Sequence, residues 1–141
     1  MSFVLDNSVA MRWLLHDGRP ADIAYAAKVL DSLETHQATV PCLWALEAAN
    51  VVAKAESKGL ISEARTRAFV ATLGRLNIAV DKATAQNALA ETLSLARRYA
   101  LSAYDAAYLE LAMRAALPLA TLDAHLLKAA KKAGVKRFEG A

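Results

Sequence analysis

Short, largely apolar runs alternate along this chain with longer segments in which apolar residues recur every three or four positions. Short apolar runs are typical of strands in a parallel sheet that helices cover on both faces. The longer period is typical of helices that pack one face against a core. Five runs have the strand pattern, and they are residues 3–6, 38–41, 77–80, 118–121 and 135–138.

Helical spacing is clearest in residues 21–34 and 84–100. Pro20 precedes the first of these segments, where its fixed φ suits the first turn of a helix. Ser62 is a typical N-cap residue and predicts a further helix over 63–74. Because strands alternate with helices, we expect an α/β fold, an α/β/α sandwich around a central, mainly parallel five-stranded sheet.

The composition predicts a single compact domain over residues 1–141. Hydrophobic residues make up 56% of the chain, with five glycines and three prolines, which argues against disorder. Charges interrupt every apolar run before it reaches the roughly 18 residues of a membrane span, so we expect no membrane association. Cys42 is the single cysteine and no basic leader precedes the first apolar run, so we expect a cytoplasmic protein.

The formal net charge is +3, and basic residues gather at 97–98 and along 128–137. This mild excess suits a polyanionic partner without requiring one.

One carboxylate stands out in the apolar segment LSAYDAAYLELA. On a helix, Asp105 shares its face with apolar neighbours and with Tyr108, which we expect to be a core residue. Glu110 and Arg114 fall on the opposite face, four residues apart, as a solvated ion pair would. A buried carboxylate needs compensation, and two sources are open: a capping box with Ser102 at the helix start, or a ligand.

Three further acids follow or flank the predicted strands. Asp6 ends the first strand and Asp123 follows the fourth, so both belong at the carboxyl rim of a parallel sheet, where sites lie. Each could equally be a plain N-cap. Glu47 shares its helical face with Asn50 and Lys54 and could belong to a solvated edge.

Converging carboxylates repel one another, and an oxygen-rich acidic site suits Mg²⁺ or Mn²⁺. A zinc site is not expected, because His16, His36 and His125 are scattered and there is one cysteine. The glycine-rich phosphate loops and the nucleophile elbow are absent as well.

Taken in order, the segments VLDNSV, LEAANVV, SAYDAAYLELA and LATLDAHL resemble the PIN-domain ribonuclease family, and most closely its small VapC-type toxins. The resemblance implies a PIN-like fold and carries the family's metal-binding acids to this chain. Ser8 lies in the D-x-S motif, Thr121 lies in the T-x-D motif and Asn50 follows the Glu by one turn, so these three would support the acids. The implied catalytic and metal-binding acids are Asp6, Glu47, Asp105 and Asp123.

The resemblance further implies a Mg²⁺-dependent endoribonuclease, with Mn²⁺ as a possible substitute, that acts as the toxin of a toxin–antitoxin pair. An RNA substrate, a small antitoxin and a homodimer are the implied partners. Lys54 and Lys58, on the Glu47 face, and Arg12 are candidate RNA contacts, although each could be a solvated charge. The alternatives are a PIN nuclease of RNA maturation or decay, and a non-catalytic α/β binding module.

Overall fold

The structure is a computed structural model, and it describes residues 1–140. Strands and helices alternate over most of this range, as the hydrophobic pattern predicts. The elements are β1 (Ser2–Leu5), α1 (Asn7–Leu15), α2 (Pro20–Ser32), β2 (Gln37–Val40), α3 (Trp44–Ser57), α4 (Glu63–Arg75), β3 (Ile78–Val80), α5 (Thr84–Asn87), a π-helical segment (Ala88–Thr92), α6 (Leu93–Tyr99), α7 (Ala103–Ala115), β4 (Leu119–Ala120) and α8 (Ala124–Lys132).

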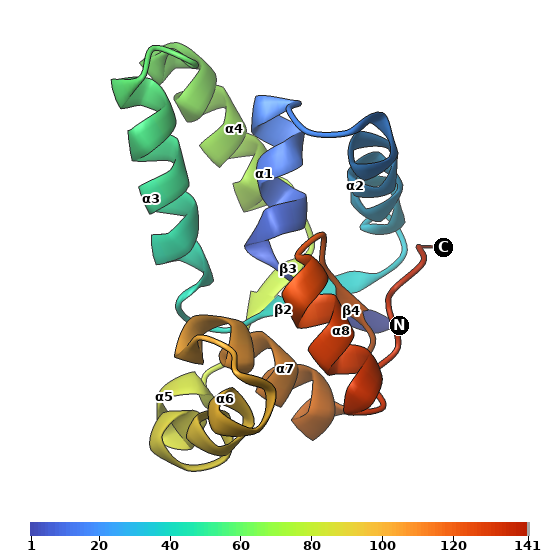
Figure 1. Cartoon of the computed structure of the whole chain (residues 1–141). Coiled ribbons are helices and arrows are strands. Elements are labelled where there is room, and N and C mark those ends of the chain that lie inside the picture. The colour runs from blue at the N-terminus through green and yellow to red at the C-terminus, as the bar shows by residue number, and fades with distance from the viewer. Residues whose placement is uncertain (141) are drawn as a thin grey trace.

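The strands form one parallel sheet in the order β3-β2-β1-β4. Helices flank this sheet: α1 to α4 lie on one side of it, and α5 to α7 lie on the other, with α8 beside β4 (Figure 1). The α/β sandwich with a parallel central sheet is therefore confirmed. Within residues 1–140 no helix has the length and apolar character needed to cross a membrane.

The prediction of a fifth strand is wrong, because the sheet has four strands in the part of the chain that the structure describes. Residues 135–138 run beside β4 but form only one parallel bridge, between Leu119 and Arg137. β4 itself is two residues long, so little edge is available for pairing. The carbonyl of Phe138 accepts a hydrogen bond from the Tyr25 hydroxyl at 2.5 Å, which directs this end of the chain toward α2.

The core forms where β1 meets α7. Phe3, Val4 and Leu5 are completely buried, as expected for a strand with helices on both faces. On α7, seven consecutive residues from 106 to 112 are buried, because the helix packs against the sheet, α6 and α8. The start of α7, which carries Asp105, is thereby held against the end of β1.

The structure confirms the predicted N-cap at Ser62, whose hydroxyl accepts a hydrogen bond from the backbone NH of Arg65 at 3.2 Å.

The environment of Glu110 differs from the solvated one that the sequence predicts. The ion pair with Arg114 is present, but Glu110 is only 3% exposed, because α7 is covered on nearly all sides. Arg114 also reaches Asp81, at the end of β3, at 2.7 Å.

Candidate active site

Asp6 is the residue directly after β1, where the chain leaves the sheet and α1 begins. It has the backbone conformation of an N-cap, yet its side chain caps nothing. Instead one carboxylate oxygen accepts hydrogen bonds from the Ser8 hydroxyl at 2.6 Å and from the Thr121 hydroxyl at 2.8 Å. Burial raises the pKa of Asp6, and the nearby charge of Asp123 raises it further. The structure thus makes Asp6 an oriented carboxylate inside the fold.

The two hydroxyls join the ends of neighbouring strands. Thr121 directly follows β4 and is completely buried, and its oxygen accepts a hydrogen bond from the backbone NH of Asp123 at 3.0 Å. Ser8 accepts one from the backbone NH of Leu122, also at 3.0 Å. The D-x-S and T-x-D segments, 113 residues apart between the two hydroxyls, therefore form one network that sets the position of Asp6 relative to Asp123.

Asp123 is the N-cap of α8, since its carboxylate accepts a hydrogen bond from the backbone NH of Leu126 at 2.9 Å. The helix N-terminus favours this negative charge. At the same time, the charge of Asp123 raises the pKa of both Asp6 and Asp105. Asp123 therefore caps a helix and also contributes to the field of the acidic site.

Glu47 lies in the first turn of α3 and accepts a hydrogen bond from the hydroxyl of Tyr108 on α7. Tyr108 is completely buried, and burial raises its pKa, so it stays protonated and donates. Burial also raises the pKa of Glu47, the Tyr108 hydrogen bond lowers it, and the charges of Asp6 and Asp105 raise it. Glu47 therefore belongs with the other acids and not to a separate solvated edge.

Asp105 occupies the first turn of α7. Its backbone NH donates to the Ser102 hydroxyl at 3.1 Å, which is half of the expected capping box. The carboxylate itself is partly buried, and its pKa is raised from 3.8 to about 6 by burial and then by the charges of Asp123 and Asp6, while His125 acts in the opposite direction. The cap thus explains where the helix starts, and leaves the carboxylate free to face the other acids.

Comparison with known proteins identifies the family of this chain. The sequence profile of the PIN domain matches residues 3–132. The chain belongs to the PIN domain family. PIN domains are generally nucleases, and they typically use divalent metal ions.

A solved structure has the same fold as this PIN domain. The crystal structure of PAE2754 from Pyrobaculum aerophilum superposes with a TM-score of 0.66 and 22% sequence identity, over 92% of this chain and 79% of that chain. No curated protein shows a significant sequence match. The likeness to PAE2754 therefore establishes the fold of this PIN domain and leaves its chemistry to its own side chains.

We call Asp6, Glu47, Asp105 and Asp123 the acidic cluster. None of these four carboxylates forms an ion pair with a Lys, Arg or His of residues 1–140, and His125 only partly offsets the effects that raise the pKa of Asp105. Four carboxylates and adjacent hydroxyls are the oxygen donors that Mg²⁺ and Mn²⁺ favour. The chemistry of the donor set therefore fits a hard divalent cation.

The positions of these side chains fit a bound cation less well than their chemistry does. Among the described residues, no three acidic, His or Cys side chains stand near enough together to form a ready-made metal site. Two of the four are committed to other partners, since Glu47 is bonded to Tyr108 and Asp123 caps α8. The four side chains therefore do not form a complete protein cage for a cation, and Mg²⁺ is usually held by one or two carboxylates together with water.

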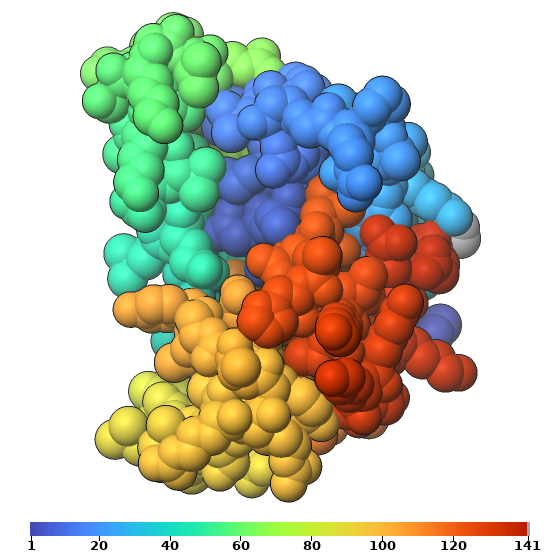
Figure 2. All heavy atoms as spheres, viewed as in Figure 1, coloured from blue at the N-terminus to red at the C-terminus, as the bar shows by residue number. Residues whose placement is uncertain are grey.

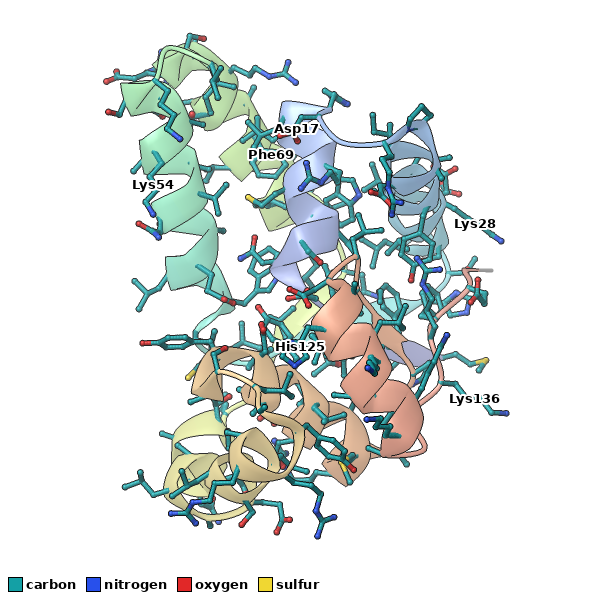
Figure 3. The ribbon with its side chains drawn as sticks, viewed as in Figure 1. Asp17, Lys28, Lys54, Phe69, His125 and Lys136 are labelled. Atoms are coloured by element: carbon teal, nitrogen blue, oxygen red, sulfur yellow. The ribbon has the colours of Figure 1, made fainter. Side chains whose placement is uncertain are left out.

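The candidate supporting and RNA-contacting residues on α3 lie at the surface. Asn50, Lys54 and Lys58 are all exposed, and Lys54 projects from the outer side of α3 (Figure 3). Arg12 is instead engaged by Asp17, both through an ion pair and through a 3.0 Å hydrogen bond to its carbonyl. Its charge is therefore partly compensated within the chain.

Sequence reasoning assigned no site role to Tyr108 or His125. Tyr108 is a core residue, as expected, but its hydroxyl holds Glu47. His125 follows Asp123 by two residues and influences Asp105. The spacing contained a signal for Tyr108, because a residue three positions after Asp105 must share its helical face.

Proposed function

We propose that this protein is a Mg²⁺- or Mn²⁺-dependent endoribonuclease whose active site is the acidic cluster. The supporting observation is that four carboxylates from separate elements gather so closely that the charges of their neighbours raise the pKa of Asp6, Glu47 and Asp105. None of the four forms an ion pair among residues 1–140. Such a cluster has no evident structural use, because burying unpaired carboxylates together is unfavourable. A divalent cation bound there would activate water and offset charge on the phosphodiester.

The residues around the cluster have distinct roles in this proposal. Ser8 and Thr121 fix the orientation of Asp6 by donating to the same oxygen of its carboxylate. The Tyr108 hydroxyl holds Glu47 by a hydrogen bond, at a position where the charges of Asp6 and Asp105 raise its pKa. Orientation of this kind reduces the reorganisation needed when substrate binds.

The test is cleavage of RNA by the purified protein with Mg²⁺ and with excess EDTA. Activity should disappear in EDTA and return when Mg²⁺ or Mn²⁺ is restored. Asp6→Asn and Asp105→Asn should each lower the rate by at least about a hundred-fold, the scale of losing one electrostatic or acid–base contribution. Glu91→Gln is a matched control, because Glu91 is exposed and lies outside the cluster. Undiminished cleavage in EDTA, or by Asp6→Asn, would refute the proposal.

The biological role that we propose is that of a toxin in a toxin–antitoxin pair, acting on RNA in the cytoplasm. An antitoxin would need an apolar surface. Two hollows offer one: a cavity of about 280 Å³ between α1, α2 and α4, and one of about 420 Å³ between α3 and α4. Phe69 and Leu73 of α4 line both, and an amphipathic helix is the element that fits such grooves.

Growth of bacteria that express the protein tests this role. Expression alone should arrest growth, Asp6→Asn should not, and co-expression with the product of an adjacent small reading frame should restore growth. Cleavage of RNA in vitro without any growth defect would favour a PIN nuclease of RNA maturation or decay. Measuring the mass of the purified protein in solution tests the homodimer that the family resemblance implies.

A further inference from the structure

A basic hollow lies next to the acidic cluster, between the C-terminal end of α6 and one face of α8. The cavity is about 300 Å³ in volume, and the two helices meet on the face of the molecule seen in Figure 2. We call it the basic cleft. Its charged and aromatic lining comes from Arg98, Tyr99, His125, Lys128 and Lys132.

The cations of the basic cleft are available to a ligand. Arg98, Lys128 and Lys132 are exposed, and none of them forms an ion pair with a carboxylate of residues 1–140. A surface charge without a partner is usually only solvated. Here three such charges line one concave surface, which concentrates their field.

The arrangement on α8 connects the basic cleft to the acidic cluster. Lys128 and Lys132 follow His125 by three and seven residues, so the three side chains share one face of the helix. His125 lies at the acidic end of that row, two residues after Asp123 and near enough to influence Asp105. At 1.5 Å per residue, the row extends about 10 Å from His125 to Lys132.

We propose that the basic cleft binds the phosphate backbone of single-stranded RNA where the strand approaches the acidic cluster. This inference rests on the proposed nuclease function. The acidic cluster repels phosphates, so a strand held across it needs cations immediately beside it. Tyr99 adds an aromatic ring to the lining, and a cationic groove with aromatic side chains is the usual means of binding single strands.

This path differs from the one along α3. Lys54 and Lys58 also lie near Glu47 in sequence, but they are on the outer surface of a separate helix, and Figure 3 shows Lys54 well apart from His125. Arg12, the third candidate, is engaged by Asp17. The concave lining of three cations favours the basic cleft as the main contact.

The test measures binding of a fluorescent, unstructured RNA oligonucleotide to the full chain in EDTA, across a range of salt concentrations. Without metal the RNA stays intact, so the result does not depend on catalysis. Each phosphate contact contributes about 0.7 to the slope of log affinity against log salt for single strands. The double variant Lys128→Gln/Lys132→Gln should therefore have a slope smaller by about 1.4. Between about 50 and about 200 mM salt, the wild type should lose about seven-fold more affinity than this variant.

Two double variants make the same charge change elsewhere. Lys28→Gln/Lys136→Gln removes exposed lysines that lie away from His125 (Figure 3) and should leave the slope unchanged. Lys54→Gln/Lys58→Gln tests the path along α3. The acidic cluster repels RNA equally in all of these proteins, so differences between them are due to the lysines.

A smaller slope in Lys128→Gln/Lys132→Gln alone supports the basic cleft. An unchanged slope there overturns the inference, and a smaller slope in Lys54→Gln/Lys58→Gln would then locate the RNA on α3. Equal losses in all three variants also overturn it, because they would indicate general charge attraction. None of these outcomes affects the proposed chemistry, since cleavage with Mg²⁺ is measured separately and can fail or succeed independently.

Discussion

Replacing Asp105 by Asn should make the metal-free protein more stable at neutral pH. Burial and the charges of Asp123 and Asp6 raise the pKa of Asp105 from 3.8 to about 6, so keeping this carboxyl ionised in the fold is unfavourable. A rise of about two units corresponds to about 3 kcal/mol. Because Asp105 is only partly buried, solvent screening reduces this to about 1.5 kcal/mol. The backbone bond from residue 105 to the Ser102 hydroxyl is kept in the variant.

The sign of the pH dependence follows from the raised pKa. Between about pH 4 and about pH 6 the folded state binds more protons at Asp105 than the unfolded state does, so the wild type loses stability as the pH rises through this window. The destabilisation is complete above about pH 6 and absent below about pH 4. The advantage of Asp105→Asn should therefore be about 1.5 kcal/mol at pH 7.5, roughly 5 °C in the melting temperature of a chain of this size, and should vanish near pH 4.

The assay is urea unfolding in EDTA at the two pH values, with Glu91→Gln as the control that removes an exposed carboxylate. Adding Mg²⁺ should reverse the order at neutral pH, because binding to the folded state stabilises the wild type more than a variant that lacks one carboxylate. The reasoning fails if Asp105→Asn is less stable than the wild type at pH 7.5, or if the difference between the two proteins is the same at both pH values.

Two further substitutions test contacts that support the site and the fold. Tyr108→Phe keeps the buried ring but removes the hydrogen bond to Glu47; it should lower stability at neutral pH by about 1.5 kcal/mol. It should also move the acidic limb of the cleavage–pH profile upward, because that bond lowers the pKa of Glu47, and an unmoved limb would contradict the positioning role. Arg114→Met leaves Glu110 buried without its cation and should lower the free energy of unfolding by about 2 kcal/mol. This is less than the roughly 3–5 kcal/mol lost when a fully buried pair is broken, because Arg114 is one-third exposed. A loss below about 0.5 kcal/mol in urea unfolding would show that another group compensates the charge of Glu110.

The sequence alone determined the features that depend on local pattern. The alternation of apolar runs with helical periods predicted the α/β sandwich, because strand and helix periods differ along the chain itself. The same logic located Asp6 and Asp123 at one rim, since the carboxyl ends of parallel strands meet there. Ser62 as an N-cap was also readable, because its partner is three residues away.

The tertiary structure alone decided contacts between distant segments. Tyr108 and Glu47 are 61 residues apart, and no local period shows that α3 delivers a carboxylate to a hydroxyl on α7. The helical period places Glu110 on the face of α7 opposite the apolar one and therefore predicts a solvent-exposed side chain. Other elements pack on the face that carries Glu110 and bury it. The run 135–138 has the composition of a strand, but pairing needs a long enough neighbour, and β4 ends after two residues. Periodicity determines which side chains share a face, whereas burial and partners depend on what the rest of the chain places against that face.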